Sequence, residues 1–236
     1  MSERLVREFR FTPFGTSMAP DRWQPADGLT PRGKVTLGVH FLAATRDERA
    51  ACERAVGEWL KDGVESYLDF RLGVRVEDAQ IRVHFGPGRD VPDDGWPGGN
   101  WSHIGRRASF EQPNRRKPTM NIQPGQPDFV VKHEFGHALG LRHEHQHPDG
   151  AITWKDEVVI AAMGAAPHHW TVEETRRNIL IPLNSAARCV GDPDPNFESV
   201  MMYDYPATWN REEREGRMGR VISARDRLCV RGLYSL

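Results

Sequence analysis

The chain has 236 residues, of which 38% are hydrophobic and 28% charged, and its 32 basic residues nearly balance 33 acidic ones. This composition predicts a folded globular protein of one or two domains and excludes an intrinsically disordered chain. The net charge of -1 argues against a nucleic-acid partner, and no segment approaches the ~20 consecutive apolar residues of a membrane helix.

The N-terminal part of the chain lacks regular patterning. Residues 1–32 are rich in Pro, Gly, Arg and Asp and are predicted to form an irregular extension to a domain that spans 33–236. The first twenty residues carry charges throughout and lack an apolar stretch, so no signal peptide is expected. A cytoplasmic location and export by a signal-less route are both compatible with this.

The first ordered elements are a strand over 34–42 and a helix over 46–61. Thr45 and Glu48 have the spacing of a capping box, which marks the start of the helix, and Gly63 provides its end. The residues expected on the inner face of this helix are Ala51, Ala55, Trp59 and Leu60.

The next segments read as short strands. Apolar residues predict strands over 67–72 and 79–85, and a long turn-rich loop is expected over 86–100. Two further strands, over 101–107 and 118–123, are expected on either side of a basic loop.

Helices dominate the second half of the chain. A helix is predicted over 128–139, with Gly140 immediately after it, and two more over 156–163 and 171–180. Thr171 provides the capping signal of the last of these.

The C-terminal region is expected to be irregular over 181–222 and to end in a helix that starts at Ser223. The inner face of that helix is predicted to carry Ala224, Leu228, Cys229 and Leu233. Strands precede the central helix and helices follow it, so the predicted fold is α+β, with an upper lobe over about 33–140 and a lower lobe over about 141–236.

The segment HEFGHALGLRH, which begins at His133, predicts a metal site. His133 and His137 are four residues apart and share one face of a helix, so both imidazoles can bind one zinc ion. Gly140 allows a sharp turn that brings His143 to the same ion. Three histidines leave one position open for water, as in catalytic zinc sites, and Glu134 lies where it can act on that water as a general base.

This segment resembles the zinc signature His-Glu-x-x-His-x-x-Gly-x-x-His of the metzincin peptidases, and Glu144 directly after it resembles the astacin branch. FESVMMY, residues 197–203, is similar to the astacin Met-turn, with Met201 as the methionine and Tyr203 as the tyrosine that approaches the metal. Residues 98–108 and 222–234 are similar to the strand upstream of the zinc helix and to the terminal helix of the family.

The resemblance implies a two-lobed catalytic domain. A small mixed β-sheet with backing helices would lie above the zinc helix, and the lower lobe would be largely irregular or helical. It implies a monomeric zinc endopeptidase with one catalytic ion, in which Met201 underlies the zinc and Tyr203 stabilises the oxyanion. A protein or peptide substrate is expected to pair with an edge strand formed by Thr119, Met120, Asn121 and Ile122.

The chain also departs from the family. Astacins typically carry two disulfides and a propeptide motif Phe-x-Gly-Asp, whereas this chain has three cysteines and no such motif. Cys52 and Cys229 lie on the two flanking helices and could face each other.

Several other polar residues are expected to lie at the surface. His145 and His147 lie just past the zinc signature and could compete for the metal, but their direction after the sharp turn is unconstrained, so they are predicted to be exposed. His103, His168 and His169 have no ligand spacing and are predicted to be structural or solvated. The basic residues Arg106, Arg107, Arg115, Arg116 and Lys117 are expected to form a solvated surface; the alternative is a subsite for acidic side chains.

Two other functional classes are weighed against the peptidase. One is a zinc-containing module that binds a peptide without cleaving it efficiently; such modules usually lose the base or a ligand, and here both are present. The other is a nucleic-acid-associated factor that uses the basic loop, which the net charge and the lack of interleaved aromatic residues disfavour.

Overall fold

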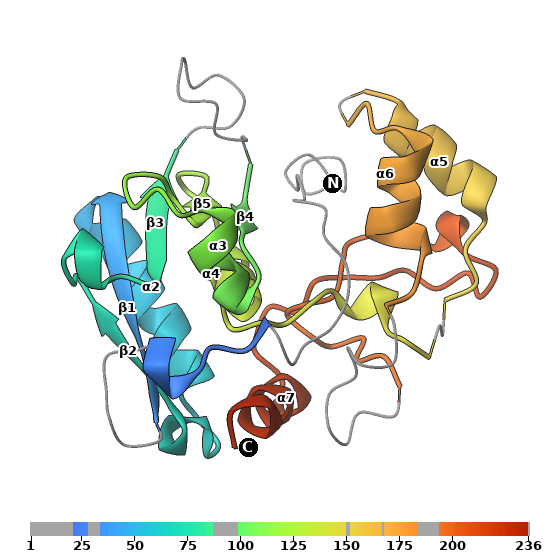
Figure 1. Ribbon diagram of the computed structural model, residues 1–236. Helices are drawn as coiled ribbons and strands as arrows, with labels where there is room; N and C mark the ends of the chain where they lie inside the picture. The colour runs from blue at the N-terminus through green and yellow to red at the C-terminus, as the bar shows by residue number, and fades with distance from the viewer. Residues whose placement is uncertain are drawn as a thin grey trace.

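The computed structural model describes residues 21–27, 34–86, 99–149, 152–166, 168–183 and 194–235. Figure 1 shows the β-sheet and α2 (Arg46–Trp59) on one side of the molecule and α5 (Asp156–Gly164) and α6 (Val172–Thr175) on the other, with α7 (Ala224–Tyr234) below. None of the helices in these ranges has the length and apolar character needed to cross a membrane. Most of the loop predicted over 86–100 lies outside the described residues.

A mixed five-stranded sheet forms the upper lobe, in the order β2-β1-β3-β5-β4. The strands are β1 (Val35–Ala43), β2 (Leu68–Leu72), β3 (Ile81–Phe85), β4 (Trp101–Ser102) and β5 (Met120–Ile122). Parallel pairing joins β1 to β2 and β3, and β3 to β5, while β4 runs antiparallel to β5.

The prediction that Thr119–Ile122 forms an edge strand is wrong, because β5 has a neighbour on each side. Its Met120 aligns with Val83 of β3 and with Ser102 of β4. The alternation of polar and apolar residues suggested one wet face, but the side chain of Asn121 is buried and hydrogen-bonded to the carbonyl oxygen of Gly99 at 2.6 Å. The last strand of the sheet is β4.

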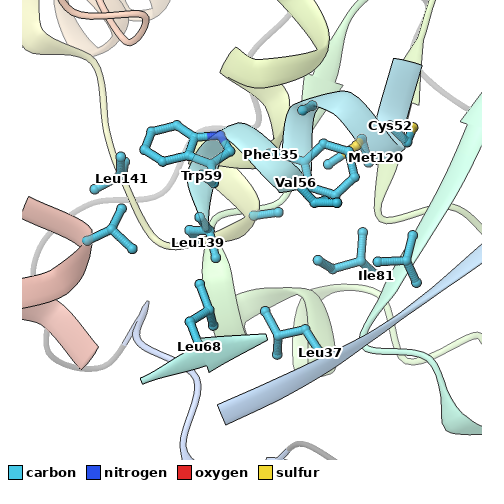
Figure 2. Close-up of a cluster of buried hydrophobic side chains, with 14 of the residues drawn as sticks. Leu37, Cys52, Val56, Trp59, Leu68, Ile81, Met120, Phe135, Leu139 and Leu141 are labelled. Carbon is cyan, nitrogen blue, oxygen red and sulfur yellow. The ribbon is translucent and has the colours of Figure 1, made fainter. Parts of the chain in front are cut away.

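Two long helices share a core with the sheet. The capping box at Thr45 starts α2 (Arg46–Trp59), which packs against α4 (Asp128–Ala138). Figure 2 shows Trp59 and Phe135, from these two helices, among the apolar side chains that meet the strands. The buried residues of α2 are Cys52, Ala55, Val56 and Trp59, so the inner face is rotated slightly from the predicted one, and Ala51 and Leu60 lie at its border.

The lower lobe has a second apolar core. It contains α5 (Asp156–Gly164), α6 (Val172–Thr175) and a π-helical turn η6 (Arg176–Leu180) that continues α6. Phe129 and Val130 of α4 belong to this core, whereas other residues of the same helix belong to the upper one. The central helix therefore lies between two lobes, which confirms the predicted α+β architecture.

The C-terminal helix α7 (Ala224–Tyr234) begins with a capping box formed by Ser223 and Asp226. Its buried residues are Asp226, Cys229, Val230, Leu233 and Tyr234. The prediction of Ala224 and Leu228 on the inner face is wrong, because the start of the helix turns the Asp226 side inward and leaves both residues exposed.

The suggested contact between Cys52 and Cys229 is also wrong. Cys52 is a buried free thiol, whereas Cys229 is disulfide-bonded. The third cysteine, Cys189, lies outside the described residues.

The remaining elements are short. They are η1 (Pro25–Asp27), η2 (Val64–Ser66), η3 (Val76–Asp78), η4 (Gly105–Arg107), α3 (Ala108–Glu111), η5 (Glu144–Gln146) and η8 (Ala207–Trp209). The strand predicted over 101–107 is therefore reduced to β4 followed by a helical turn. Residues 21–27 pack against the domain, with Trp23 in the upper-lobe core.

Candidate metal centre

The end of α4 is a tight turn that redirects the chain. The amide of Leu141 donates to the carbonyl oxygen of Gly136 at 3.0 Å, and the amide of Gly140 donates to that of His137 at 2.8 Å. This pair of hydrogen bonds is the Schellman motif, which requires a left-handed residue, and Gly140 has a φ of 99°. The turn brings His143 back toward the helix.

Three histidine side chains converge as a result. Nε2 of His143 lies 3.1 Å from Nε2 of His137 and 3.2 Å from Nε2 of His133. The ligand atoms of all three lie within 4.8 Å of one another, and all three residues are buried. The sequence-predicted ligand set therefore meets at one point.

Backbone carbonyls orient two of these rings. Nδ1 of His133 lies 2.7 Å from the carbonyl oxygen of Val200, and Nδ1 of His137 lies 2.9 Å from that of Leu141. A carbonyl only accepts, so each Nδ1 carries the proton and each Nε2 presents a lone pair to the centre. Burial lowers the pKa of His133 to about 4 and those of His137 and His143 well below the usual value, which favours the neutral, ligating form.

The donor set fits a zinc ion. Two nitrogens bound tetrahedrally to one zinc would lie roughly 3.3 Å apart, close to the observed separations. Lone pairs that face one another at such distances repel unless a cation lies between them.

Both carboxylate oxygens of Glu134 are buried and lack a hydrogen-bond partner among the described residues, and burial raises the pKa of this carboxyl well above its usual range. A buried carboxyl group without a protein partner calls for an explanation such as a bound water, and Glu134 directly follows the ligand candidate His133 in the chain.

The predicted Met-turn lies against the same helix. A Cβ at Gly136 of α4 would overlap the sulfur of Met201, so the helix and the turn are in close contact at this glycine. The amide of Glu144 donates to the carbonyl oxygen of Met201 at 3.1 Å. The ring of Tyr203 lies edge-on to His143 with 6.0 Å between centroids, and burial raises the pKa of its phenol.

Helix α7 holds this turn in place through residues that the sequence analysis missed. The hydroxyl of Ser199 donates to Oδ1 of Asp226 at 2.5 Å, and the amide of Val200 donates to Oδ2 at 3.2 Å. The carbonyl that orients His133 is thus fixed by a carboxylate from the last helix. The capping spacing from Ser223 to Asp226 was the available signal, but it indicates a helix start and not this contact.

The prediction that His145 and His147 are exposed is wrong. Both are buried, because the turn after His143 folds the chain into the lower lobe. Nε2 of His145 bonds the carbonyl oxygen of Asn178 at 3.0 Å, and its ring lies 5.0 Å from that of Tyr203. His147 accepts from the amide of Asp149 at 3.2 Å.

The basic residues are only partly a solvated surface. Arg115 and Arg116 are exposed, and Arg106 pairs with Asp27 at 2.8 Å. Arg107 is directed inward instead. His103 is buried and pairs with Glu111 at 2.9 Å, a structural contact.

Comparisons with known proteins give structural matches only. No protein-family model and no curated protein matches the chain. A structure of myroilysin matches with a TM-score of 0.73 and 24% identity over 93% of this chain and 98% of that one. A second, a crystal structure of myroilysin, gives a TM-score of 0.59 and 24% identity over 94% and 89%.

A third match is high choriolytic enzyme 1, a hatching enzyme zinc-protease from the medaka fish Oryzias latipes. It gives a TM-score of 0.57 and 16% identity over 90% of this chain and 96% of that one. Together with the two lobes on either side of α4, these matches show that the chain shares the fold of these structures, in agreement with the two-lobed α+β fold that the resemblance to astacin-like metzincins implied.

Proposed function

We propose that this protein is a zinc endopeptidase that hydrolyses peptide bonds of protein substrates. The observation that carries the proposal is the convergence of three buried Nε2 atoms, together with the buried and unpartnered carboxyl group of Glu134, the residue that follows His133 in the chain. The fold shared with a zinc-protease supports it. We assign the activity to a monomeric catalytic domain over 33–236 with one ion, against which residues 21–27 pack.

His133, His137 and His143 would hold the metal in neutral form. A zinc ion held there would supply Lewis acidity, lowering the pKa of a water toward about 7 and polarising a peptide carbonyl. The remaining work falls to the side chains of the chain.

Glu134 is the proposed general base. Its carboxylate takes a proton from the attacking water and then delivers it to the leaving nitrogen of the substrate. Neither oxygen has a hydrogen-bond partner among the described residues, so both keep their lone pairs for a water held at the metal.

Tyr203 is the proposed oxyanion donor. Because burial raises the pKa of the phenol, the hydroxyl keeps its proton at neutral pH and can donate to the substrate carbonyl oxygen as negative charge develops there. Met201 would form the floor beneath the histidines.

The substrate is proposed to bind as an added strand. Since β5 is an inner strand, an extended peptide would pair with β4, the last strand of the sheet, instead of with residues 119–122. This places the substrate on the side of the sheet that adjoins α4, which contacts β4.

Metal analysis combined with a peptide library tests the proposal. We expect purified protein to contain zinc in a one-to-one ratio and to cleave internal peptide bonds, with the loss of activity on chelation reversed by added zinc. Zinc binding with no cleavage of any library peptide would support the alternative, a zinc-containing module that binds peptides. Activity that survives prolonged chelation would contradict a catalytic zinc.

A further inference from the structure

A short N-terminal segment, Asp21–Trp23, lies against the end of α4, and we refer to it as the strap. The indole Nε1 of Trp23 donates to the carbonyl oxygen of Ala138 at 2.8 Å. Ala138 is the last residue of α4, so its carbonyl has no partner within the helix. The indole is buried and therefore caps the helix end in a dry environment.

The carboxylate of Asp21 joins two guanidinium groups. Its Oδ2 accepts from Nη2 of Arg142 and its Oδ1 accepts from Nε of Arg107, both at 2.5 Å. The side chains of Asp21 and Arg142 are 1% and 8% exposed. Arg142 directly precedes His143 in the chain. Loss of the carboxylate would leave two positive charges close together and largely buried, which is strongly unfavourable.

The backbone of the strap is equally close to the turn. A Cβ at Gly105 would overlap the carbonyl oxygen of Asp21, and a Cβ at Gly140 would lie 3.5 Å from the same oxygen. Both glycines have positive φ values, 48° and 99°. The strap therefore lies between the loop that contains η4 and the turn that leads to His143.

Helix α7 supports the same turn from another side. The hydroxyl of Tyr234 donates to the carbonyl oxygen of Leu139 at 3.0 Å, and Nη1 of Arg22 in the strap donates to that of Leu233 at 3.1 Å. The turn itself does not satisfy the carbonyl oxygens of Ala138 and Leu139. The side chains of Trp23 and Tyr234 cap them instead.

We propose that Asp21 and Trp23 are positioning residues for His143: by fixing the turn over 139–142 they hold the third imidazole where it meets the other two. This inference rests on the proposed zinc site. His133 and His137 are positioned by the helix itself, whereas His143 depends on a turn whose outer side is held by the strap. Partners that orient metal ligands typically contribute 10–100-fold to metal affinity.

The test uses the full-length protein with the substitutions Asp21→Asn and Trp23→Phe. Matched controls are Asp128→Asn, which removes a carboxylate paired with Arg54 at the start of α4, and Trp59→Phe, which removes an indole that donates to Lys132 in the middle of α4. The zinc dissociation constant is measured by competition with a chelator, at a temperature at which near-ultraviolet circular dichroism shows each metal-free variant to be folded. The visible absorption spectrum of the Co²⁺-substituted protein reports the geometry of the ligands.

We expect the strap variants to raise the zinc dissociation constant by about tenfold or more and to alter the Co²⁺ spectrum, while the controls change neither. Arg142→Gln combined with Asp21→Asn should weaken zinc binding no more than the stronger single variant, since the two side chains act as a unit. If Asp21→Asn does not fold, Trp23→Phe decides the question.

The outcomes separate this inference from the proposed function. Strap variants that match their controls in zinc affinity and Co²⁺ spectrum would reduce the strap to a stabilising element and overturn the inference alone. A wild-type protein that binds zinc without cleaving peptides would overturn the peptidase but leave the strap measurable. A wild-type protein that binds no zinc would overturn both.

Discussion

Nδ1 of His133 lies 2.7 Å from the carbonyl oxygen of Val200, although the two residues are 67 positions apart in the chain. This contact joins the central helix to the turn over 199–203 and sets the tautomer of the imidazole. Because the partner is a backbone carbonyl, its position depends on the fold of the turn and not on the side chain of Val200. The ligand geometry is thus tied to Asp226, which holds that turn.

The first prediction concerns Glu134. Glu134→Gln should keep the fold and the zinc but lower kcat by about 10²–10⁴-fold or more, because the amide cannot accept the proton from water. The thermal midpoint of the metal-free variant should be no lower than that of the wild type, since an amide is less costly to bury than an unpartnered carboxylate. Zinc content, calorimetry and steady-state kinetics measure these effects. Turnover at the wild-type rate would exclude Glu134 as the base.

The second prediction concerns Tyr203. Tyr203→Phe should retain zinc and leave KM similar, while kcat falls by ~10²–10³, the usual effect of losing one oxyanion donor. If the tyrosine serves only to pack in the lower lobe, phenylalanine would be nearly silent in kcat. Steady-state kinetics distinguish the two, and an unchanged kcat would remove Tyr203 from the mechanism.

The third prediction concerns the pH dependence of stability in the metal-free protein. Burial lowers the pKa of His145 to about 4, whereas an unfolded histidine titrates near ~6.5. Between these values the unfolded chain binds a proton that the folded chain does not, so stability falls as the pH falls through this window. Each such histidine changes the free energy of unfolding by at most about 1.4 kcal/mol per pH unit.

The measurement is a series of urea unfolding curves between about pH 7 and pH 5. It is made in the Glu134→Gln background, because burial raises the pKa of Glu134, whose protonation would stabilise the fold as the pH falls and so oppose the histidines. Adding His145→Gln should flatten the dependence, whereas His169→Gln at an exposed position should not. Identical slopes in both variants would contradict a buried neutral His145.

The fourth prediction concerns the contact between Gly136 and Met201. Alanine normally stabilises a helix relative to glycine by about 1 kcal/mol. At Gly136 the added Cβ would overlap the sulfur of Met201 and lie 3.1 Å from Trp59, so we expect Gly136→Ala to destabilise the protein by ~1–3 kcal/mol. Gly57→Ala is the control, because a Cβ at this position in α2 meets nothing within 4 Å. Equal effects of the two substitutions on the urea midpoint would refute the contact.

The fifth prediction concerns the thiols. Unfolded protein without reductant should react with a thiol reagent at Cys52 but not at Cys229, which is disulfide-bonded and should be labelled only after reduction. In the folded state Cys52 should react slowly, because burial raises the pKa of its thiol to about 12. Mass spectrometry of labelled peptides identifies the sites. Labelling of Cys229 without reductant would contradict the disulfide.

Local sequence patterns determined the elements and the metal ligands of this protein. The capping boxes at Thr45 and Thr171 predicted helix starts that the structure contains, and the left-handed turn at Gly140 followed from glycine chemistry. The three histidines could be grouped from sequence because helical spacing and one turn, both local features, bring them together.

Contacts between distant segments were decided only by the tertiary structure. The inner position of β5 depends on the pairing of β4 across its other side, and the burial of His145 depends on the lower lobe closing over it. Neither has a local signature, because a polar residue that finds a partner in the fold looks the same in sequence as one that faces water. Asp21 is the clearest case: its place between Arg107 and Arg142 joins residues that lie 86 and 121 positions away along the chain.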